Sequence, residues 1–76
     1  MSKLSLVSSK QMVKIIETIG FEKLRQNGSH ARYGNGEGKF TVVPMHNRDL
    51  PRGLIRSILN DVNLTVEDYE TIRKNV

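Results

Sequence analysis

The chain has no cysteine, no long apolar run and no secretory leader pattern. Without cysteine, neither a disulfide framework nor a thiolate metal site can form. A membrane-spanning helix needs about 20 consecutive apolar residues, and no stretch of the sequence approaches that length. The start, MSKLSLVSSK, lacks the apolar region and the small-residue cleavage site of a signal peptide. We therefore expect a cytoplasmic protein that has no membrane partner.

The length and the charge of the chain limit further which class of protein it can be. The 76 residues fit one small domain, residues 1–76, and leave no room for a second. Twelve Lys and Arg against eight Asp and Glu give a formal net charge of +4. An excess of cations favours polyanionic partners, nucleic acid first, although many small basic domains bind none.

The first regular element is predicted to be a helix over residues 9–19. Ser8 and Gln11 have the spacing of a capping box, in which each side chain bonds the other residue's backbone N–H. Apolar residues then recur at helical spacing as far as Ile19, and Gly20 follows as a helix stop.

Three strands should come next, over residues 21–26, 29–34 and 39–44. Asn27-Gly28 is the favoured pair for a two-residue type I′ turn, so it predicts a hairpin between the first two strands. The glycine-rich stretch GNGEG connects the second strand to the third. An antiparallel meander is the simplest arrangement of such strands.

Two more helices complete the chain. Asp49 is placed as an N-cap with Pro51 in the first turn, ahead of an apolar stripe that ends near Val62. A short last helix is predicted from Thr65. The result is an α+β fold of order α-β-β-β-α-α, with a three-stranded antiparallel sheet and its helices packed on one face. The other face of the sheet is then free for a ligand.

The turn at Asn27-Gly28 also fixes a register. It places Arg25 opposite His30 and Lys23 opposite Arg32. Because side chains alternate along a strand, the open face should carry these three cations and the histidine. The helix-packed face should carry Leu24, Ala31 and Tyr33.

The second loop extends this assignment to the third strand. A four-residue loop, Asn35–Gly38, adds Phe40 and Val42 to the helix-packed face. Thr41 and Val43 would then join the basic face.

A histidine among arginines suits RNA cleavage. An imidazole exchanges protons near neutral pH, and RNA supplies its own nucleophile, the 2′-hydroxyl. In-line attack would give a 2′,3′-cyclic phosphate and a 5′-hydroxyl, with no metal or other cofactor. Arg25, Arg32 and Lys23 would neutralise charge developing on the phosphate.

Plainer interpretations stay open. A single histidine on a polar strand is often only solvated, and a basic cluster is often only an exposed surface. Ser29 either orients His30, touches phosphate or merely closes the turn. His46, after Pro44 in VPMHN, fits a structural or RNA-contacting residue better than the main catalyst. The chain could also be a non-catalytic RNA-binding module on the same face, or a protein-interaction domain.

Three segments in order carry a family resemblance: GFEKLRQNGSHARY, TVVPMH and LPRGLIRSIL. Together they resemble the HicA family of mRNA interferase toxins from bacterial and archaeal toxin–antitoxin systems. The resemblance extends from about Ser8 to Ile72. It implies a fold similar to a double-stranded RNA-binding domain, α-β-β-β-α, which agrees with the predicted order.

The resemblance also implies a site and partners. His30 matches the catalytic histidine of a Gly-Ser-His motif, Gly28 and Ser29 match the rest of that motif, and His46 matches the histidine after the proline. The implied activity is ribosome-independent cleavage of mRNA. The implied partner is a HicB-type antitoxin that covers the active face, and any oligomer is expected through that complex.

Overall fold

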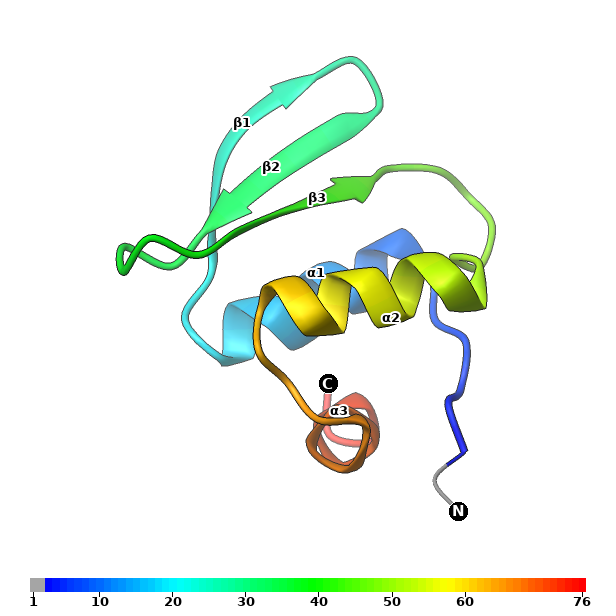
Figure 1. Ribbon diagram of the computed structural model, residues 1–76. Coiled ribbons are helices and arrows are strands. Elements are labelled where there is room, and N and C mark those ends of the chain that lie inside the picture. The colour runs from blue at the N-terminus through cyan, green and yellow to red at the C-terminus, as the bar shows by residue number, and fades with distance from the viewer. Residues whose placement is uncertain (1–2) are drawn as a thin grey trace.

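Residues 3–76 are described by the computed structural model, in which they form three helices and three strands (Figure 1). Residues 1 and 2, where the predicted domain begins, lie outside the described part. In chain order the elements are α1 (Ser9–Thr18), β1 (Glu22–Asn27), β2 (His30–Gly34), β3 (Phe40–Pro44), α2 (Arg52–Asp61) and α3 (Val66–Arg73). This order confirms the predicted α+β fold.

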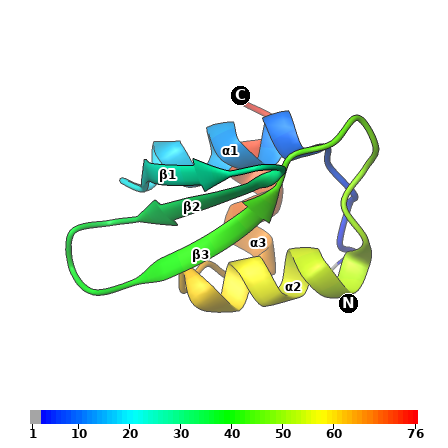
Figure 2. The ribbon, with the colours of Figure 1, turned by 90° about the horizontal axis from the view of Figure 1, so that it is seen from above.

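The elements stack in layers. The strands form one antiparallel sheet in the order β1-β2-β3. Helices α1 and α2 run beneath one face of the sheet, and α3 lies on the far side of those two helices (Figures 1 and 2). Among the described elements, no helix lies on the other face, which we call the open face. In residues 3–76, no helix is long and apolar enough to cross a membrane.

Local sequence determines two of the helix starts. The Ser8 side chain accepts from the Gln11 N–H at 3.2 Å, and the Gln11 side chain accepts from the Ser8 N–H at 3.0 Å. This confirms the predicted capping box of α1. The Thr65 hydroxyl accepts from the Asp68 N–H at 3.1 Å, which confirms the start of α3.

The predicted N-cap of α2 is wrong. Pro51 occupies the cap position and makes no side-chain capping bond. Asp49 instead forms a β-bridge with Ser8, and the Leu50 N–H donates to the Val7 carbonyl at 2.8 Å. This pairing keeps the chain extended through Asp49. The helix therefore begins at Arg52, after Pro51, and not directly after Asp49.

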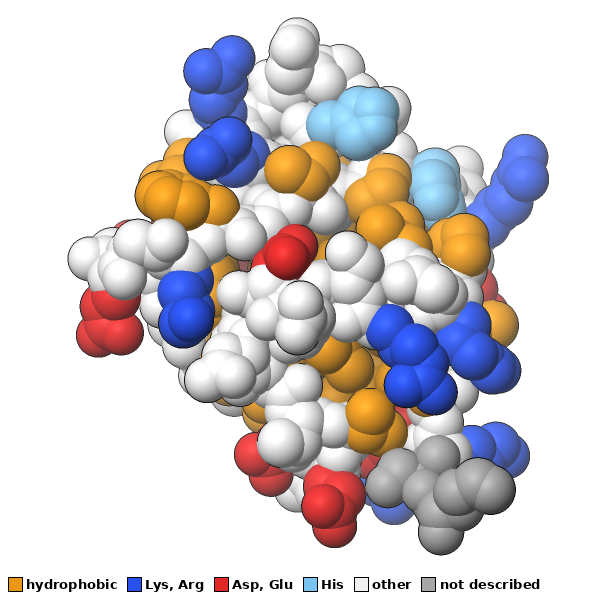
Figure 3. Space-filling view, in the orientation of Figure 1, with side chains coloured by type: hydrophobic (Ala, Val, Ile, Leu, Met, Phe, Trp, Pro, Cys, Tyr) orange, Lys and Arg blue, Asp and Glu red, His pale blue; other side chains and the backbone are white. Residues whose placement is uncertain are grey.

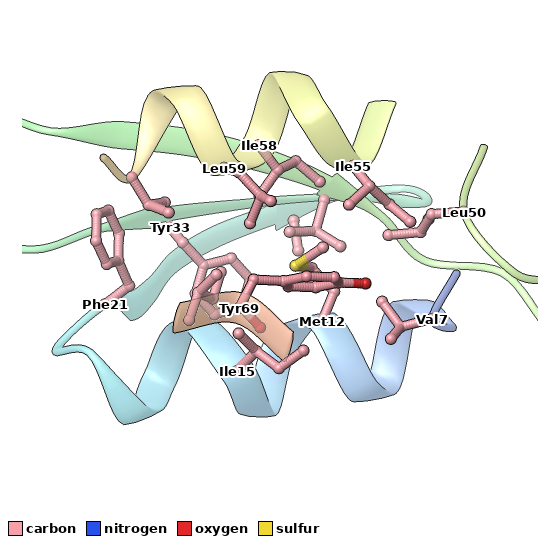
Figure 4. Close-up of a cluster of buried hydrophobic side chains, with 14 of the residues drawn as sticks. Val7, Met12, Ile15, Phe21, Tyr33, Leu50, Ile55, Ile58, Leu59 and Tyr69 are labelled. Atoms are coloured by element: carbon pink, nitrogen blue, oxygen red, sulfur yellow. The ribbon is translucent and has the colours of Figure 1, made fainter. Parts of the chain in front are cut away.

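The core lies between the sheet and helices α1 and α2, and it continues between these helices and α3 (Figure 4). Tyr69 is completely buried there, and its hydroxyl donates to the Ser5 carbonyl at 2.6 Å. The pKa of Tyr69 is raised to about 12, mainly by burial and next by the nearby Glu70 carboxylate. The hydroxyl therefore stays protonated and remains a donor. The buried apolar side chains are Leu4, Val7, Met12, Ile15, Ile16, Phe21, Ala31, Tyr33, Val43, Leu50, Ile55, Ile58, Leu59, Val62 and Tyr69.

Candidate functional site

The turn between β1 and β2 lies one residue later than predicted. Asn27 pairs with His30, so Gly28 and Ser29 are the two turn residues. Gly28 has a φ of 63°, whereas Ser29 has no positive φ. A type II′ turn requires a positive φ only at its first central position, where glycine adopts it freely. The predicted Asn27-Gly28 loop would require positive φ at Asn27 as well.

This change corrects the predicted pairing of the basic residues. Arg25 pairs with Arg32, and the prediction that it faces His30 is wrong. Lys23 pairs with Tyr33, so its predicted place on the open face is also wrong; its Nζ donates to Gln26 Oε1 at 2.8 Å. Moving the turn by one residue changes the partner of Arg25 by two positions, from His30 to Arg32, so the turn alone leaves the side chains of β1 on their predicted faces.

A β-bulge accounts for the changed face of Lys23. The register of β1 against β2 is interrupted between Lys23 and Arg25. A bulge puts two residues of one strand opposite one residue of the other. Leu24 and Arg25 consequently border the same surface hollow as His30 and Arg32. Arg25 lies on the turn side of the bulge and keeps its predicted face, because its new partner, Arg32, is two positions from the predicted one, His30.

The loop before β3 is one residue longer than predicted. The structure pairs Gly34 with Phe40, leaving five residues between them instead of the predicted four, Asn35–Gly38. The Asn35 backbone N–H donates to the Lys39 carbonyl at 3.2 Å, and the Asn35 side chain accepts from the Lys39 N–H at 3.2 Å. These bonds hold the two ends of the longer loop together.

The longer loop reverses the predicted faces of β3. Thr41 and Val43 are buried on the helix side, whereas Phe40 is 46% and Val42 is 42% exposed. Leu24, which was predicted to pack against helices, is 53% exposed. Three apolar residues, Leu24, Phe40 and Val42, therefore lie on the open face. The sequence pattern did not predict this, and the register of the sheet shows it.

The open face contains a hollow of about 360 Å³ around His30. Its lining residues are Leu24, Arg25, Asn27, His30, Arg32 and Val42. The structure thus brings His30, Arg25 and Arg32 together, as predicted, and leaves His30 exposed. Figure 3 shows both histidines of the chain in pale blue on the upper, sheet side of the molecule.

The second histidine is held at the same end of the sheet. The Met45 N–H donates to the Ser29 carbonyl, so the chain stays beside the β1–β2 turn after β3 ends. Ser9, which is 1% exposed, donates its hydroxyl to the Pro44 carbonyl and accepts from the His46 N–H at 3.2 Å. The start of α1 and the β1–β2 turn therefore fix the segment that ends in His46.

His46 borders a separate hollow of about 410 Å³. Its Nδ1 accepts from the Arg48 N–H at 3.2 Å, which places the proton of the neutral ring on Nε2. The hollow is lined by Ser8, Ser9, Lys10, Met45, His46 and Asn47. Sequence reasoning missed the part that Ser9 plays in positioning this segment.

The open face is positively charged and lacks carboxylate partners. Among residues 3–76, the only ion pair joins Arg73 and Glu70 at 2.8 Å. Arg25 and Arg32 therefore have no carboxylate to neutralise them. The only acidic residue in the three strands is Glu22, at the opposite end of β1 from Asn27, the partner of His30. An anionic ligand would meet two unpaired guanidinium groups beside His30.

The turn glycine yields a stability prediction. Gly28→Ala should destabilise the fold by about 1–2 kcal/mol, because alanine is strained at positive φ. Free space surrounds the missing side chain, so the effect is one of backbone conformation. Gly53→Ala is the matched control: it lies in α2 at an ordinary φ with open space, and it should stabilise by about 0.5–1 kcal/mol. Urea unfolding measures both, and equal effects would contradict the assigned turn.

The fold and the site together define a small basic α+β domain with a cationic, uncovered sheet face. A family model described as the HicA toxin of bacterial toxin–antitoxin systems matches residues 9–64. The chain therefore belongs to the HicA toxin family, as its motifs indicated. Membership implies an antitoxin as a protein partner. A search of curated proteins finds no match.

Proposed function

We propose that the protein is a metal-independent, ribosome-independent endoribonuclease toxin that cleaves mRNA, with His30 as general acid/base. The observation that carries the proposal is the hollow on the open face, where exposed His30 lies with Arg25 and Arg32. Toxins of the HicA family are generally ribonucleases, which supports the reaction class.

The chemistry follows from the groups in the hollow. His30 removes the proton of a ribose 2′-hydroxyl, and that oxygen attacks the adjacent phosphorus in line with the leaving 5′-oxygen. A 2′,3′-cyclic phosphate forms, the bond between phosphorus and the 5′-oxygen breaks, and a proton returned to that oxygen gives a 5′-hydroxyl. Arg25 and Arg32 stabilise the negative charge that grows on the phosphate oxygens.

The remaining motif residues have supporting roles in this proposal. Gly28 and Ser29 form the turn that positions His30 at the start of β2. His46, held near that turn, contacts the RNA strand beyond the reacting phosphate. Lys23 has no part in the hollow, because it pairs with Tyr33 and donates to Gln26.

A HicB-type antitoxin is the proposed inhibitor. Covering the open face would block His30 and both arginines with one protein surface. Since mRNA is the proposed substrate, the proposed compartment is the cytoplasm. A non-catalytic RNA-binding module would use the same cationic face, and product analysis separates it from an enzyme.

The end groups of the products test the proposal. Purified protein and labelled RNA in the presence of a chelator should yield 2′,3′-cyclic phosphate and 5′-hydroxyl ends. One 2′-deoxynucleotide at a cleavage site should abolish cleavage there, because the nucleophile is missing. Products with 5′-phosphate ends, or loss of activity with the chelator, would contradict the mechanism. Binding without any cleavage would favour the non-catalytic module.

A further inference from the structure

Phe40 is the one aromatic side chain of the sequence that the fold leaves exposed. The chain has two Phe and two Tyr and no Trp. Phe21, Tyr33 and Tyr69 are each at most 3% exposed, whereas Phe40 is 46% exposed. Its strand position puts it on the open face, with His30.

Gly34 allows the Phe40 side chain to pack close to the backbone of the sheet. Gly34, the cross-strand partner of Phe40, has no side chain to hold the neighbouring residues apart. A Cβ atom there would lie 2.9 Å from Leu24 Cδ1 and 3.1 Å from Phe40 Cδ1. Both side chains therefore reach over the Gly34 backbone and form an apolar floor beside the hollow.

Arg32 lies between this apolar floor and His30. Its guanidinium carbon lies 4.8 Å from the centroid of the Phe40 ring, a cation–π contact. Arg32 follows His30 by two positions on β2, a spacing of about 7 Å along a strand. A guanidinium stacks through its flat faces and donates hydrogen bonds through its edge. Stacking on Phe40 therefore leaves the edge available to a phosphate.

We propose that Phe40 and Arg32 form a stacking platform for one unpaired base of the RNA substrate, next to the phosphate that His30 attacks. The inference rests on the proposed function, since the ligand is the proposed substrate. Bases of single-stranded RNA stack on aromatic rings and on arginine planes, whereas a duplex keeps those base faces covered. The unpaired charge of Arg25 and Arg32 complements the RNA backbone.

The platform would have two consequences for the substrate. It selects unpaired RNA over duplex RNA, because only an unpaired base exposes a face to the guanidinium and the ring. It also fixes the position of the strand, because a base held over Phe40 determines which phosphate reaches His30. Phe40 is then a positioning residue that acts through the strand and Arg32.

Binding of an uncleavable RNA tests the platform. A 2′-O-methyl oligonucleotide lacks the nucleophile, so its affinity is measured without chemistry. Phe40→Leu keeps an apolar side chain and removes the ring, and it should weaken single-strand binding by about 5- to 100-fold. Affinity for a duplex of the same sequence should change less than about twofold. Leu6→Ala is the control, because Leu6 is 43% exposed and lies outside the sheet.

Abasic substitutions locate the base. One base at a time would be removed from the oligonucleotide, and its affinity would be measured for the wild type and for Phe40→Leu. At one position the loss of the base should weaken binding to the wild type but leave binding to Phe40→Leu unchanged. Unchanged affinity in Phe40→Leu, or an equal loss for single strand and duplex, would overturn the platform. Weakened antitoxin binding with RNA affinity intact would overturn it in favour of a protein-docking surface.

The outcomes separate this inference from the proposed function. RNA cleavage with no effect of Phe40→Leu overturns the platform alone. A ring-dependent affinity for single strands without any cleavage supports the platform and overturns the endonuclease. Thermal unfolding of Phe40→Leu and Leu6→Ala should match the wild type, since both side chains are about half exposed.

Discussion

Replacing His30 with alanine is expected to lower the rate of RNA cleavage by about 100- to 10,000-fold, the usual contribution of a positioned acid/base group. The side chain is exposed, so its removal should leave the core intact. The neighbours of His30 across the sheet, Asn27 and Pro44, keep their backbone pairing. Affinity for uncleavable RNA should therefore stay within a few-fold of the wild type, about 1 kcal/mol or less.

Single-turnover kinetics with enzyme in excess provide the measurement, because they report the chemical step. His46→Ala is the matched control: it removes the other histidine of the chain from the same end of the sheet. A residue that only contacts RNA should weaken binding more than it slows the step. Cleavage by His30→Ala at the wild-type rate would refute the assignment, and so would a loss confined to His46→Ala.

Reversing the charge of both arginines should cause the second large effect. Arg25→Glu together with Arg32→Glu should weaken RNA binding by about 100-fold or more, because each charge-assisted bond contributes about 1.5–3 kcal/mol. The slope of log affinity against log salt should fall by about 1.4, since each phosphate contact in a single strand contributes about 0.7.

The control must carry the same change in net charge. Arg52→Glu with Arg56→Glu alters two exposed arginines of α2, on the helical side of the sheet. If the open face binds RNA, this pair should reduce affinity only slightly and leave the salt slope nearly unchanged. An equal loss in both double variants would mean that RNA responds to the overall charge and not to this face.

Local features of the sequence predicted the elements well. The capping box of Ser8 and Gln11 and the cap at Thr65 involve bonds between residues three apart, so the sequence contains both partners. The exposure of His30 and its grouping with Arg25 and Arg32 were also predicted. That grouping survives because a turn displaced by one residue shifts the register by two, which leaves Arg25 on the same face as His30 and Arg32.

The pairing of the strands was harder to predict. Asn27-Gly28 and Gly28-Ser29 both suit two-residue turns, and they differ by one residue in position and by two residues in register. Gly28 alone takes positive φ in the actual turn, and this favours the second choice. The loop before Phe40 posed the same difficulty, and its additional residue moved Phe40 and Val42 to the open face.

Contacts between segments that are distant in the chain could not be predicted from the sequence. Ser9 bonds Pro44 and His46 across more than thirty positions of the chain. Nothing in the local pattern around a serine at a helix start indicates a partner so far away. The position of His46 beside the β1–β2 turn therefore emerges only from the folded chain.

Nuclear magnetic resonance most directly tests the central claim, that the register of the sheet directs His30 and the two arginines at RNA. Isotope-labelled protein would be titrated with an uncleavable single-stranded RNA, and chemical shifts would be followed for each residue. The largest changes should occur at Arg25, His30 and Arg32, with α3 nearly unaffected. Changes centred on the helices, with these three residues unmoved, would contradict the claim.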